Sequence, residues 1–218
     1  MRISPLFDAL SDRATGWRDV NGMRTVTSFA AEADAATLGL ADVSCLSRTG
    51  LKGPQAASWL ERNGLPVPGE ANTWAPLDGG GLIGRLAWSE FFVEDGPGGA
   101  NAARIAAALV PGTAGVYPVL RQDCALVLSG RRSLEVLAQT CNVNFGALDL
   151  GRRPLVMTSI VGVSVLVVPE AREGAPAYRI WCDPSFAPYL FNTLLEISEE
   201  SGGGPIGFAR VYPASIAT

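Results

Sequence analysis

The chain has 218 residues, of which 48% are hydrophobic and 17% are charged, and its formal net charge is −4. These values predict a globular protein with one large core or two small ones. The acidic balance argues against a nucleic-acid surface, which needs clustered cations. Because the chain contains no histidine, catalytic triads and zinc sites that depend on this side chain are excluded.

The first half of the chain predicts short strands and helices separated by loops. We expect an extended N-terminal arm over 1–23, a strand over 24–29, a helix over 30–38, a strand over 42–52, a helix ending at Gly64, a proline-rich loop over 65–76, two strand pieces around Trp88, and a helix over 102–109. An arm of this kind often lies on a partner.

The second half predicts a β-α-β-β-β-α order. The expected elements are a strand over 116–128, a helix over 131–141, a hairpin of 155–160 and 163–168, a strand over 178–182, and a helix capped by Asp183 that ends at the glycines 202–204. This order predicts an antiparallel sheet with helices on one face. We therefore expect an α+β fold with subdomains over 24–115 and 116–204, the second ferredoxin-like, followed by a C-terminal tail over 205–218.

A strand-turn-helix pattern occurs twice in the chain. The apolar positions coincide when Gly53 is placed over Gly130: Leu51 with Leu128, Trp59 with Val136, and Leu60 with Leu137. This match indicates an internal duplication, and a chance coincidence of two ordinary strand-helix turns is the alternative. In the first copy, Trp59 and Leu60 are expected to anchor a core.

The cysteines and the N-terminus bear on the compartment. Cys45, Cys124, Cys141 and Cys182 form no Cys-x-x-Cys motif, which predicts buried thiols in a reducing compartment. The first 17 residues lack the apolar run of a signal peptide, and no window reaches the ~20 apolar residues of a membrane span. We expect a cytoplasmic protein.

Several motifs allow both a functional and a structural interpretation. The glycines 79–81 resemble a phosphate-binding loop but lack its Lys-Ser/Thr pair, so we favour a turn. Arg131 and Arg132 open a helix, either paired with Glu135 or directed at an acidic patch on another subunit. Four side chains close together in one predicted strand could form an active site: Ser44, Cys45, Arg48 and Lys52. No base is available to activate a nucleophile among them.

The order and spacing of several short motifs carry a family resemblance. These motifs are Ser4-Pro5-Leu6, Asp42-Val43-Ser44, Gly50-Leu51-Lys52-Gly53-Pro54, Trp59-Leu60, Gly64-Leu65-Pro66-Val67-Pro68, Arg85-Leu86, Glu90-Phe91-Phe92, Leu128-Ser129-Gly130, Tyr178-Arg179-Ile180-Trp181, Ser185-Phe186-Ala187 and Tyr189-Leu190. In this respect the chain resembles the gamma subunit of heterotetrameric sarcosine oxidase, which is related to the glycine-cleavage aminomethyltransferase and to YgfZ-type folate-binding proteins.

The resemblance implies a subunit with the fold of the N-terminal domains of the aminomethyltransferase. Its expected partners are alpha, beta and delta subunits, which would carry FAD, FMN, NAD, tetrahydrofolate and zinc. The complex would oxidatively demethylate an N-methyl amino acid such as sarcosine and pass the one-carbon unit to tetrahydrofolate. No catalytic, cofactor-binding or metal-binding residue is expected in this chain, and Trp17, Trp74 and Trp88 are the candidate contacts with partners.

The chain also departs from the family pattern. Where aminomethyltransferases carry an Asp-Asp-Leu motif that positions folate, this chain has Ile83-Gly84-Arg85-Leu86. The leading hypothesis is therefore a non-catalytic subunit. The alternatives are a stand-alone folate-dependent aminomethyltransferase that uses Asp78, Glu90 or Glu94, and a folate-binding module. Trp74 is either part of the core or a partner contact, and we favour the core for it.

Overall fold

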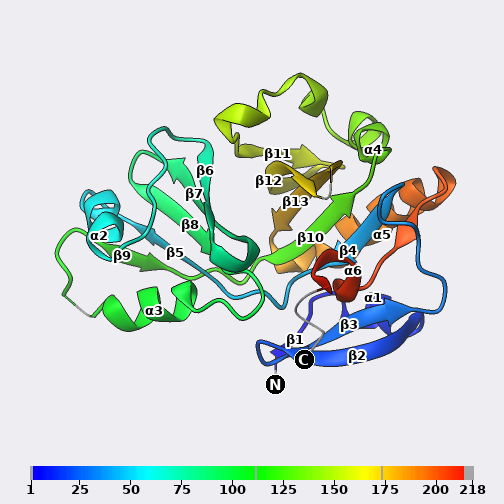
Figure 1. The fold of residues 1–218 in the computed structure, drawn as a ribbon, viewed down its shortest axis with the longest axis horizontal. Helices are drawn as coiled ribbons and strands as arrows, with labels where there is room; N and C mark the ends of the chain where they lie inside the picture. Colours follow the sequence, from blue (N-terminus) through cyan, green and yellow to red (C-terminus); the bar gives the residue numbers. More distant parts are fainter. Residues whose placement is uncertain (1, 111, 173, 214–218) are drawn as a thin grey trace. The chain divides into compact units, whose positions relative to one another are not determined.

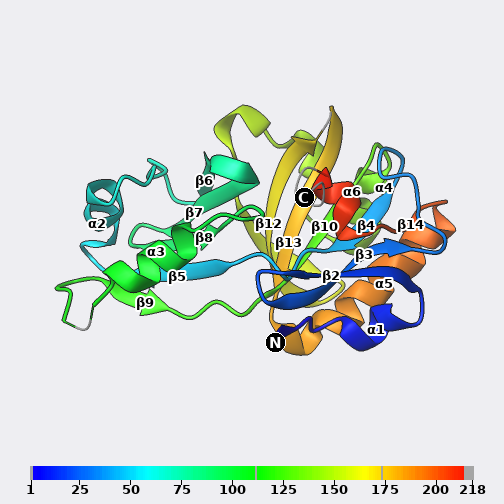
Figure 2. The same cartoon turned by 60° about the horizontal axis from the view of Figure 1, so that its bottom comes forward.

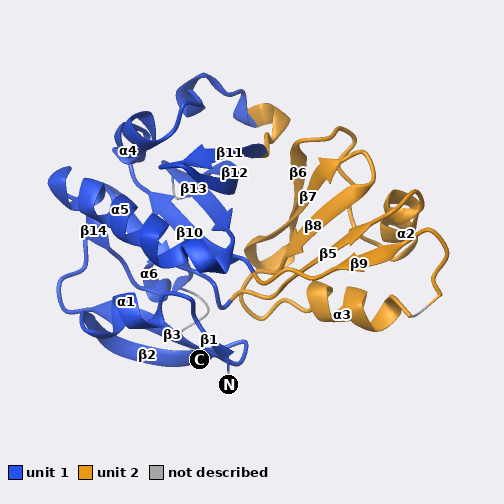
Figure 3. Ribbon diagram, turned by 180° about the vertical axis from the view of Figure 1, so that it is seen from behind, with its two compact units in different colours: residues 1–45, 123–150, 156–218 blue, residues 46–122, 151–155 orange. Residues whose placement is uncertain are grey.

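The computed structural model describes residues 2–110, 112–172 and 174–213. Figure 1 shows the elements in chain order. The chain divides into two compact units, shown in different colours in Figure 3. Unit 1 consists of Met1–Cys45, Asp123–Leu150 and Val156–Thr218, and unit 2 consists of Leu46–Gln122 and Gly151–Leu155. Among the described residues, no helix is long and apolar enough to cross a membrane.

Unit 1 contains a six-stranded sheet in the order β11-β12-β13-β10-β4-β14 and a three-stranded sheet in the order β1-β3-β2. Its strands are β1 (Arg2–Ile3), β2 (Ala14–Val20), β3 (Met23–Phe29), β4 (Gly39–Asp42), β10 (Cys124–Ser129), β11 (Val156–Ile160), β12 (Val163–Arg172), β13 (Ala175–Cys182) and β14 (Gly204–Pro205). Its helices are α1 (Phe7–Ser11), α4 (Ser133–Thr140), α5 (Ala187–Glu200) and α6 (Phe208–Val211), with short 3-10 turns at η2 (Phe145–Ala147) and η4 (Pro184–Phe186).

The core of unit 1 lies on one face of the six-stranded sheet. Leu126, Leu128 and Ile180 are buried there. The helix α5 packs on this core because its apolar residues recur at helical spacing: Ala187, Leu190, Phe191, Leu194 and Leu195. The short helix α6, red in Figures 1 and 2, lies against β3 and β4.

Unit 2 contains one antiparallel sheet in the order β6-β7-β8-β5-β9. Its elements are β5 (Arg48–Lys52), α2 (Ala56–Arg62), β6 (Thr73–Leu77), η1 (Asp78–Gly80), β7 (Gly81–Ala87), β8 (Glu90–Glu94), α3 (Asn101–Ala108) and β9 (Tyr117–Val119). The turn η3 (Leu150–Arg152) leads into its last segment. The core joins Leu51 and Phe91 of the sheet to Trp59 of α2 and Ile105 of α3.

The predicted internal repeat is confirmed as a structural repeat. Unit 2 runs β5-α2-β6-β7-β8-α3 and unit 1 runs β10-α4-β11-β12-β13-α5, and the strands of the two series stand in the same order in their sheets. Gly53 and Gly130 occupy equivalent turns, with φ of 131° and 106°. A Cβ on Gly53 would lie 2.3 Å from the carbonyl oxygen of Gly115, and one on Gly130 would lie 2.5 Å from the main chain of Thr37. Only glycine suits either turn.

The domain boundaries predicted from the sequence require correction. Each of the predicted strands 42–52 and 116–128 is in fact two strands that belong to different units, divided near residues 45 and 122. The first predicted strand is apolar around residue 45, so its local pattern carried no sign of the change of sheet. In the second, the polar run Arg121-Gln122-Asp123 stands at the change. The predicted boundary between residues 115 and 116 therefore falls inside unit 2.

The N-terminal and C-terminal segments also differ from expectation. Residues 1–23 are not an extended arm, because they contain α1 and β2, and β2 pairs with β3 along its length. The predicted tail includes α6, and its last residues, 214–218, lie outside the described residues.

Two further local predictions were wrong. The predicted helix over 30–38 is absent, because Asp34 caps a turn by accepting from the N–H of Ala36 and Glu32 accepts from the main chain of Phe29 and Gly207. A short alanine-rich segment has little helical stability of its own, so such contacts override it. The proline-rich loop over 65–76 contains the start of β6, an edge strand that tolerates Pro76.

Candidate functional site

The hairpin of β7 and β8 holds a buried arginine. Arg85 is 6% exposed. Its Nε and Nη2 donate to the carbonyl oxygen of Trp88 at 3.2 and 2.7 Å, and its Nη1 donates to the carbonyl oxygens of Pro68 and Gly69 at 2.9 and 3.1 Å. The guanidinium also lies 4.4 Å from the Trp88 ring centre and 5.4 Å from that of Phe91. Arg85 thus ties the loop before β6 to the β7–β8 turn.

The charge of Arg85 is not balanced by an ion pair. Within the described residues, no carboxylate forms a salt bridge with it. Main-chain carbonyls and two aromatic rings therefore solvate a buried cation, which is a costly arrangement unless every donor is used. Four of its five N–H donors are used here.

The residues around Arg85 do not fit the folate-positioning role that the family resemblance assigns to this place. Arg85 is cationic and gives four of its five N–H donors to main-chain carbonyls. Next to it, a Cβ on Gly84 would lie 2.4 Å from Cδ1 of Leu155, so the leucine side chain fills the space beside this strand. Neither residue offers a carboxylate, and we derive no chemical step through folate.

Two of the three alternative carboxylates form ion pairs and the third is exposed in a turn. Glu94 is fully buried and its Oε2 lies 2.9 Å from Nη2 of Arg48. Glu90 pairs with Arg121 at 3.2 Å, and Asp78 is exposed in η1. The predicted strand site is divided between the units, because Ser44 and Cys45 belong to unit 1 whereas Arg48 and Lys52 belong to unit 2.

The three tryptophans predicted to contact partners lie in different environments. Trp17 is half-buried against the core of unit 1, with its ring centre 5.2 Å from that of Phe7. Trp74 is half-buried in β6, with the Arg153 guanidinium 5.9 Å from its ring, and its buried indole N–H has no acceptor among the described residues. Trp88 is 75% exposed. Trp88 is therefore the most accessible of the three.

The end of the sheet beside Trp88 carries two further exposed side chains. The N–H of Gly53 donates to the carbonyl oxygen of Ser89 at 2.9 Å. Lys52 is exposed and pairs in register with Tyr117, which is 56% exposed. We call Lys52, Trp88, Ser89 and Tyr117 the Trp88 surface. Sequence reasoning found only Trp88, although the status of Lys52 as the sole lysine was a usable signal.

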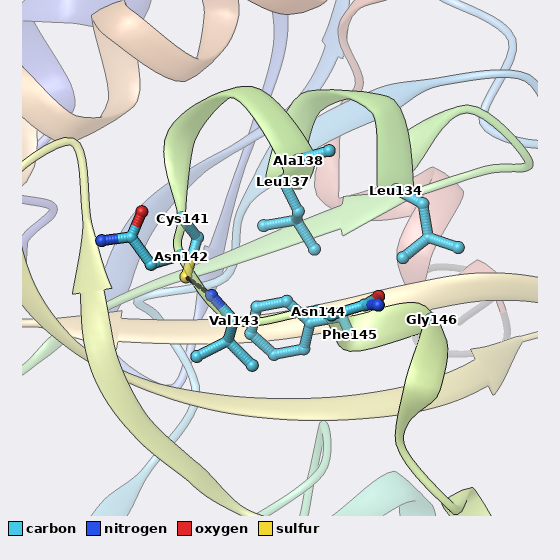
Figure 4. Close-up of a pocket in the computed structure, with 9 residues that line it drawn as sticks. All are labelled: Leu134, Leu137, Ala138, Cys141, Asn142, Val143, Asn144, Phe145 and Gly146. Atoms are coloured by element: carbon cyan, nitrogen blue, oxygen red, sulfur yellow. Dashed lines mark hydrogen bonds between the residues drawn. The ribbon is translucent and has the colours of Figure 1, made fainter.

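A cavity of about 440 Å³ lies at the end of α4 in unit 1 (Figure 4). It is lined by Leu134, Leu137, Ala138, Cys141, Asn142, Val143, Asn144, Phe145 and Gly146. The N–H of Val143 lies 3.5 Å from the Cys141 sulfur, shown by a dashed line in Figure 4. None of these lining side chains is charged, and the chain has no histidine. The lining offers Cys141 no general base.

A second cavity in unit 1, of about 360 Å³, contains two arginines whose charges are compensated. Arg210 pairs with Glu32 at 2.8 Å. Arg172 pairs with Glu170 at 2.5 Å, and Glu170 also accepts from the buried Arg179 at 3.1 Å. Burial raises the pKa of Glu170, but the two arginines outweigh this effect and hold its pKa below the ordinary value. These contacts stabilise unit 1 and leave little unpaired charge for a ligand.

The thiols are mostly buried, as predicted. Cys45, Cys124 and Cys182 are buried and Cys141 is half-buried. Cys124 and Cys182 face each other in register on β10 and β13. Hydrogen bonding to Cys182 and burial raise the pKa of Cys124 well above its usual value, which keeps this thiol protonated and unreactive. The described residues contain no group of three or more His, Cys, Asp or Glu side chains suited to a metal ion.

The arginines at the start of α4 have an ordinary structural partner. Arg132 pairs with Glu135 at 2.7 Å and also donates to the carbonyl oxygen of Ser201. For Arg132, this confirms the interpretation as a local pair. The glycines 79–81 form the turn η1 and the start of β7, without a helix behind them.

Comparison with solved structures identifies the fold. The glycine cleavage system aminomethyltransferase T from Bartonella henselae matches with a TM-score of 0.71 and 17% identity, over 95% of this chain and 60% of that one. Heterotetrameric sarcosine oxidase from Corynebacterium sp. U-96, in complex with pyrrole 2-carboxylate, matches with a TM-score of 0.64 and 20% identity, over 91% of this chain and 95% of the matched chain.

The comparisons by sequence gave no match to a family model or to a curated protein. At identities of 17% and 20%, the structural likeness shows the fold alone. The chain therefore has the α+β fold of the aminomethyltransferases, as the sequence predicted, and it spans only 60% of the aminomethyltransferase that it matches.

Proposed function

Given this aminomethyltransferase-like fold, we propose that the chain is a non-catalytic, gamma-type subunit of a flavin-dependent, sarcosine oxidase-like complex. Its work is to brace a larger subunit. The complex oxidatively demethylates an N-methyl amino acid, with one-carbon transfer to tetrahydrofolate on another subunit. The proposed partners are alpha, beta and delta subunits, which carry FAD, FMN, NAD, tetrahydrofolate and zinc, and the proposed location is the cytoplasm.

The observation that carries this proposal is the coverage of the two structural matches. The chain accounts for 95% of a chain of the sarcosine oxidase but for only 60% of the aminomethyltransferase. The fold of this chain therefore matches a chain of the first over nearly its whole length and the second over only part of it. The position of Arg85 supports the same proposal, because a buried cation bound to main-chain carbonyls stands where the family resemblance places a folate-positioning carboxylate.

A second candidate function is a stand-alone, folate-binding protein of the aminomethyltransferase kind. The observation that favours it is the TM-score of 0.71 to the aminomethyltransferase, which extends over 95% of this chain. Calorimetric titration of the isolated chain with tetrahydrofolate distinguishes the two functions. The subunit proposal predicts no binding in the micromolar range, whereas micromolar binding supports the alternative.

The subunit proposal is tested by co-expression of the chain with the products of the genes that flank its own. We expect a flavin-containing complex that includes this chain and that fails to assemble, or loses its amine oxidase activity, when the chain is omitted. A complex that assembles with full flavin content and full activity without the chain would falsify the bracing role.

A further inference from the structure

We propose that the Trp88 surface is the docking site for an acidic protein partner, which inserts an apolar pocket over Trp88 and places carboxylates beside Lys52. This inference rests on the proposed function and adds to it the position of the contact and the chemistry of the partner.

Trp88 is 75% exposed, but its main chain and one face of its ring are held by contacts with Arg85. Its carbonyl oxygen accepts two hydrogen bonds from the buried guanidinium of Arg85, and its ring lies 4.4 Å from the same group. The next residue, Ser89, is tied to Gly53 through its carbonyl oxygen. A large aromatic fixed in this way loses little conformational entropy on binding, and Trp is enriched among the residues that dominate binding energies.

The charge at this end of the sheet is positive in a protein whose formal net charge is −4. The nearby pairs Glu90–Arg121 and Glu70–Arg152 are each neutral. Glu90 lies opposite Lys52 in register but pairs with Arg121 at 3.2 Å. Within the described residues Lys52 and Arg85 form no ion pair, so Lys52 leaves one exposed positive charge and Arg85 a buried one behind it. Complementary charge selects partners and steers association, and the complement of this surface carries Asp and Glu side chains.

Tyr189 and Phe186 provide a contrast within the same chain. They are 55% and 53% exposed at the start of α5 in unit 1. Asp183 precedes them and Glu196 follows on the exposed side of the helix, so their setting is acidic. The hydroxyl of Tyr189 donates to the carbonyl oxygen of Val161 at 3.3 Å. These aromatics are exposed like Trp88, although less so, and their setting is acidic where that of Trp88 is basic, which makes Tyr189→Ala the control.

The test measures the dissociation of this chain, on dilution, from the assembled co-expressed complex at increasing sodium chloride concentration. We expect Trp88→Ala to weaken binding about 30-fold, as for a central interface aromatic. Lys52→Gln is expected to weaken it by about threefold and to reduce its salt dependence. Tyr189→Ala is expected to change it less than about twofold.

The variant Trp88→Ala retains the fold because the bonds from Arg85 reach the main-chain carbonyl, which remains after substitution. Its melting temperature should stay within about 2 °C of the wild type. As a second measurement, the emission of Trp88 is obtained as the difference in fluorescence between the wild type and Trp88→Phe. This emission should be quenched by acrylamide in the free chain and protected from acrylamide in the complex. Protection that is equal in the wild type and in Trp88→Phe would contradict the site.

The outcomes separate this inference from the function on which it rests. If the wild-type chain joins no complex, the proposed function fails. If a complex forms and Trp88→Ala binds as well as the wild type, only the docking site is overturned. If Trp88→Ala weakens binding but neither salt nor Lys52→Gln has an effect, the partner is apolar and the acidic chemistry is wrong.

Discussion

Units 1 and 2 repeat one topology but place their buried charges at different positions. In unit 2, Arg48 on β5 faces Glu94 on β8 in register. The equivalent positions in unit 1 hold Ala125 and Trp181, which also face each other. Conversely, unit 1 buries Arg179 where unit 2 has Phe92. The topology therefore depends on what the units share, namely the glycine turns and the apolar helix-facing positions.

The ion pairs are specific to each unit, which makes them sensitive points for each unit separately. Glu94→Gln leaves Arg48, only 3% exposed in its side chain, without its charge partner. Removing one member of a buried pair costs about 3–5 kcal/mol. Urea denaturation followed by circular dichroism should show this loss in unit 2. A cost under about 1 kcal/mol, typical of surface pairs, would mean that Glu94 is replaceable.

The equivalent apolar positions of the two helices test how alike the cores are. Trp59 is 7% exposed on α2, and its counterpart Val136 is fully buried on α4. We expect Trp59→Ala to lower the free energy of unfolding by about 3–5 kcal/mol and Val136→Ala by about 2 kcal/mol, because the cost scales with the volume removed. Equal losses from both variants would show that the helices are not packed alike.

The two glycine turns should respond alike to substitution. Gly53→Ala and Gly130→Ala each put a Cβ within 2.5 Å of the main chain at positive φ. We expect each to cost about 2–3 kcal/mol through strain and displaced backbone. The matched control is Gly98→Ala, which has positive φ but meets no atom within 4 Å. It should cost only about 1 kcal/mol. If the denaturation midpoint of Gly98→Ala fell as far as those of Gly53→Ala and Gly130→Ala, the close approach of the Cβ to the main chain would not be the cause of the loss in stability.

Glu170 in unit 1 makes a contribution to stability that depends on pH, and its loss is among the smaller effects that we expect. Its pKa in the folded protein lies below the ordinary 4.5, because Arg179 and Arg172 outweigh the effect of burial. A lowered pKa means that the carboxylate stabilises unit 1 above pH 4.5 and that this contribution is lost as the pH falls through the folded pKa. We expect Glu170→Gln to cost about 2 kcal/mol at neutral pH and progressively less in acid. A cost independent of pH would contradict this origin.

Much of the repeated topology could be predicted from the sequence, because it depends on local patterns. The hairpin of β11 and β12, the helix α5 and the coincidence of Gly53 with Gly130 all follow from periodicity and turn residues within about 20 positions. The division between units was missed because each crossing, near residues 45 and 122, lies inside a stretch predicted as one strand. The chain is apolar near residue 45, whereas the polar run Arg121-Gln122-Asp123 marks the second crossing. Local pattern does not distinguish one long strand from two short ones in different sheets.

The candidate site was only partly predictable. The sequence predicted Trp88 as a contact with a partner, because it stands between two strand pieces. The role of Arg85 could not be predicted, because its acceptors, Pro68 and Gly69, come from a distant loop and are main-chain atoms without a residue signature. Trp17 illustrates the opposite case: its half-buried contact with the core of unit 1 predicts that Trp17→Ala also lowers the melting temperature.

The state in which the chain exists in its native host tests the subunit proposal most directly. An affinity-tagged copy, expressed from its own locus and analysed by native mass spectrometry with the flavin absorbance of the same fraction, reports both assembly and cofactor content. We predict one copy of this chain in a stoichiometric complex with larger, flavin-containing chains. Recovery of the chain alone, free of flavin and able to bind tetrahydrofolate, would contradict the account.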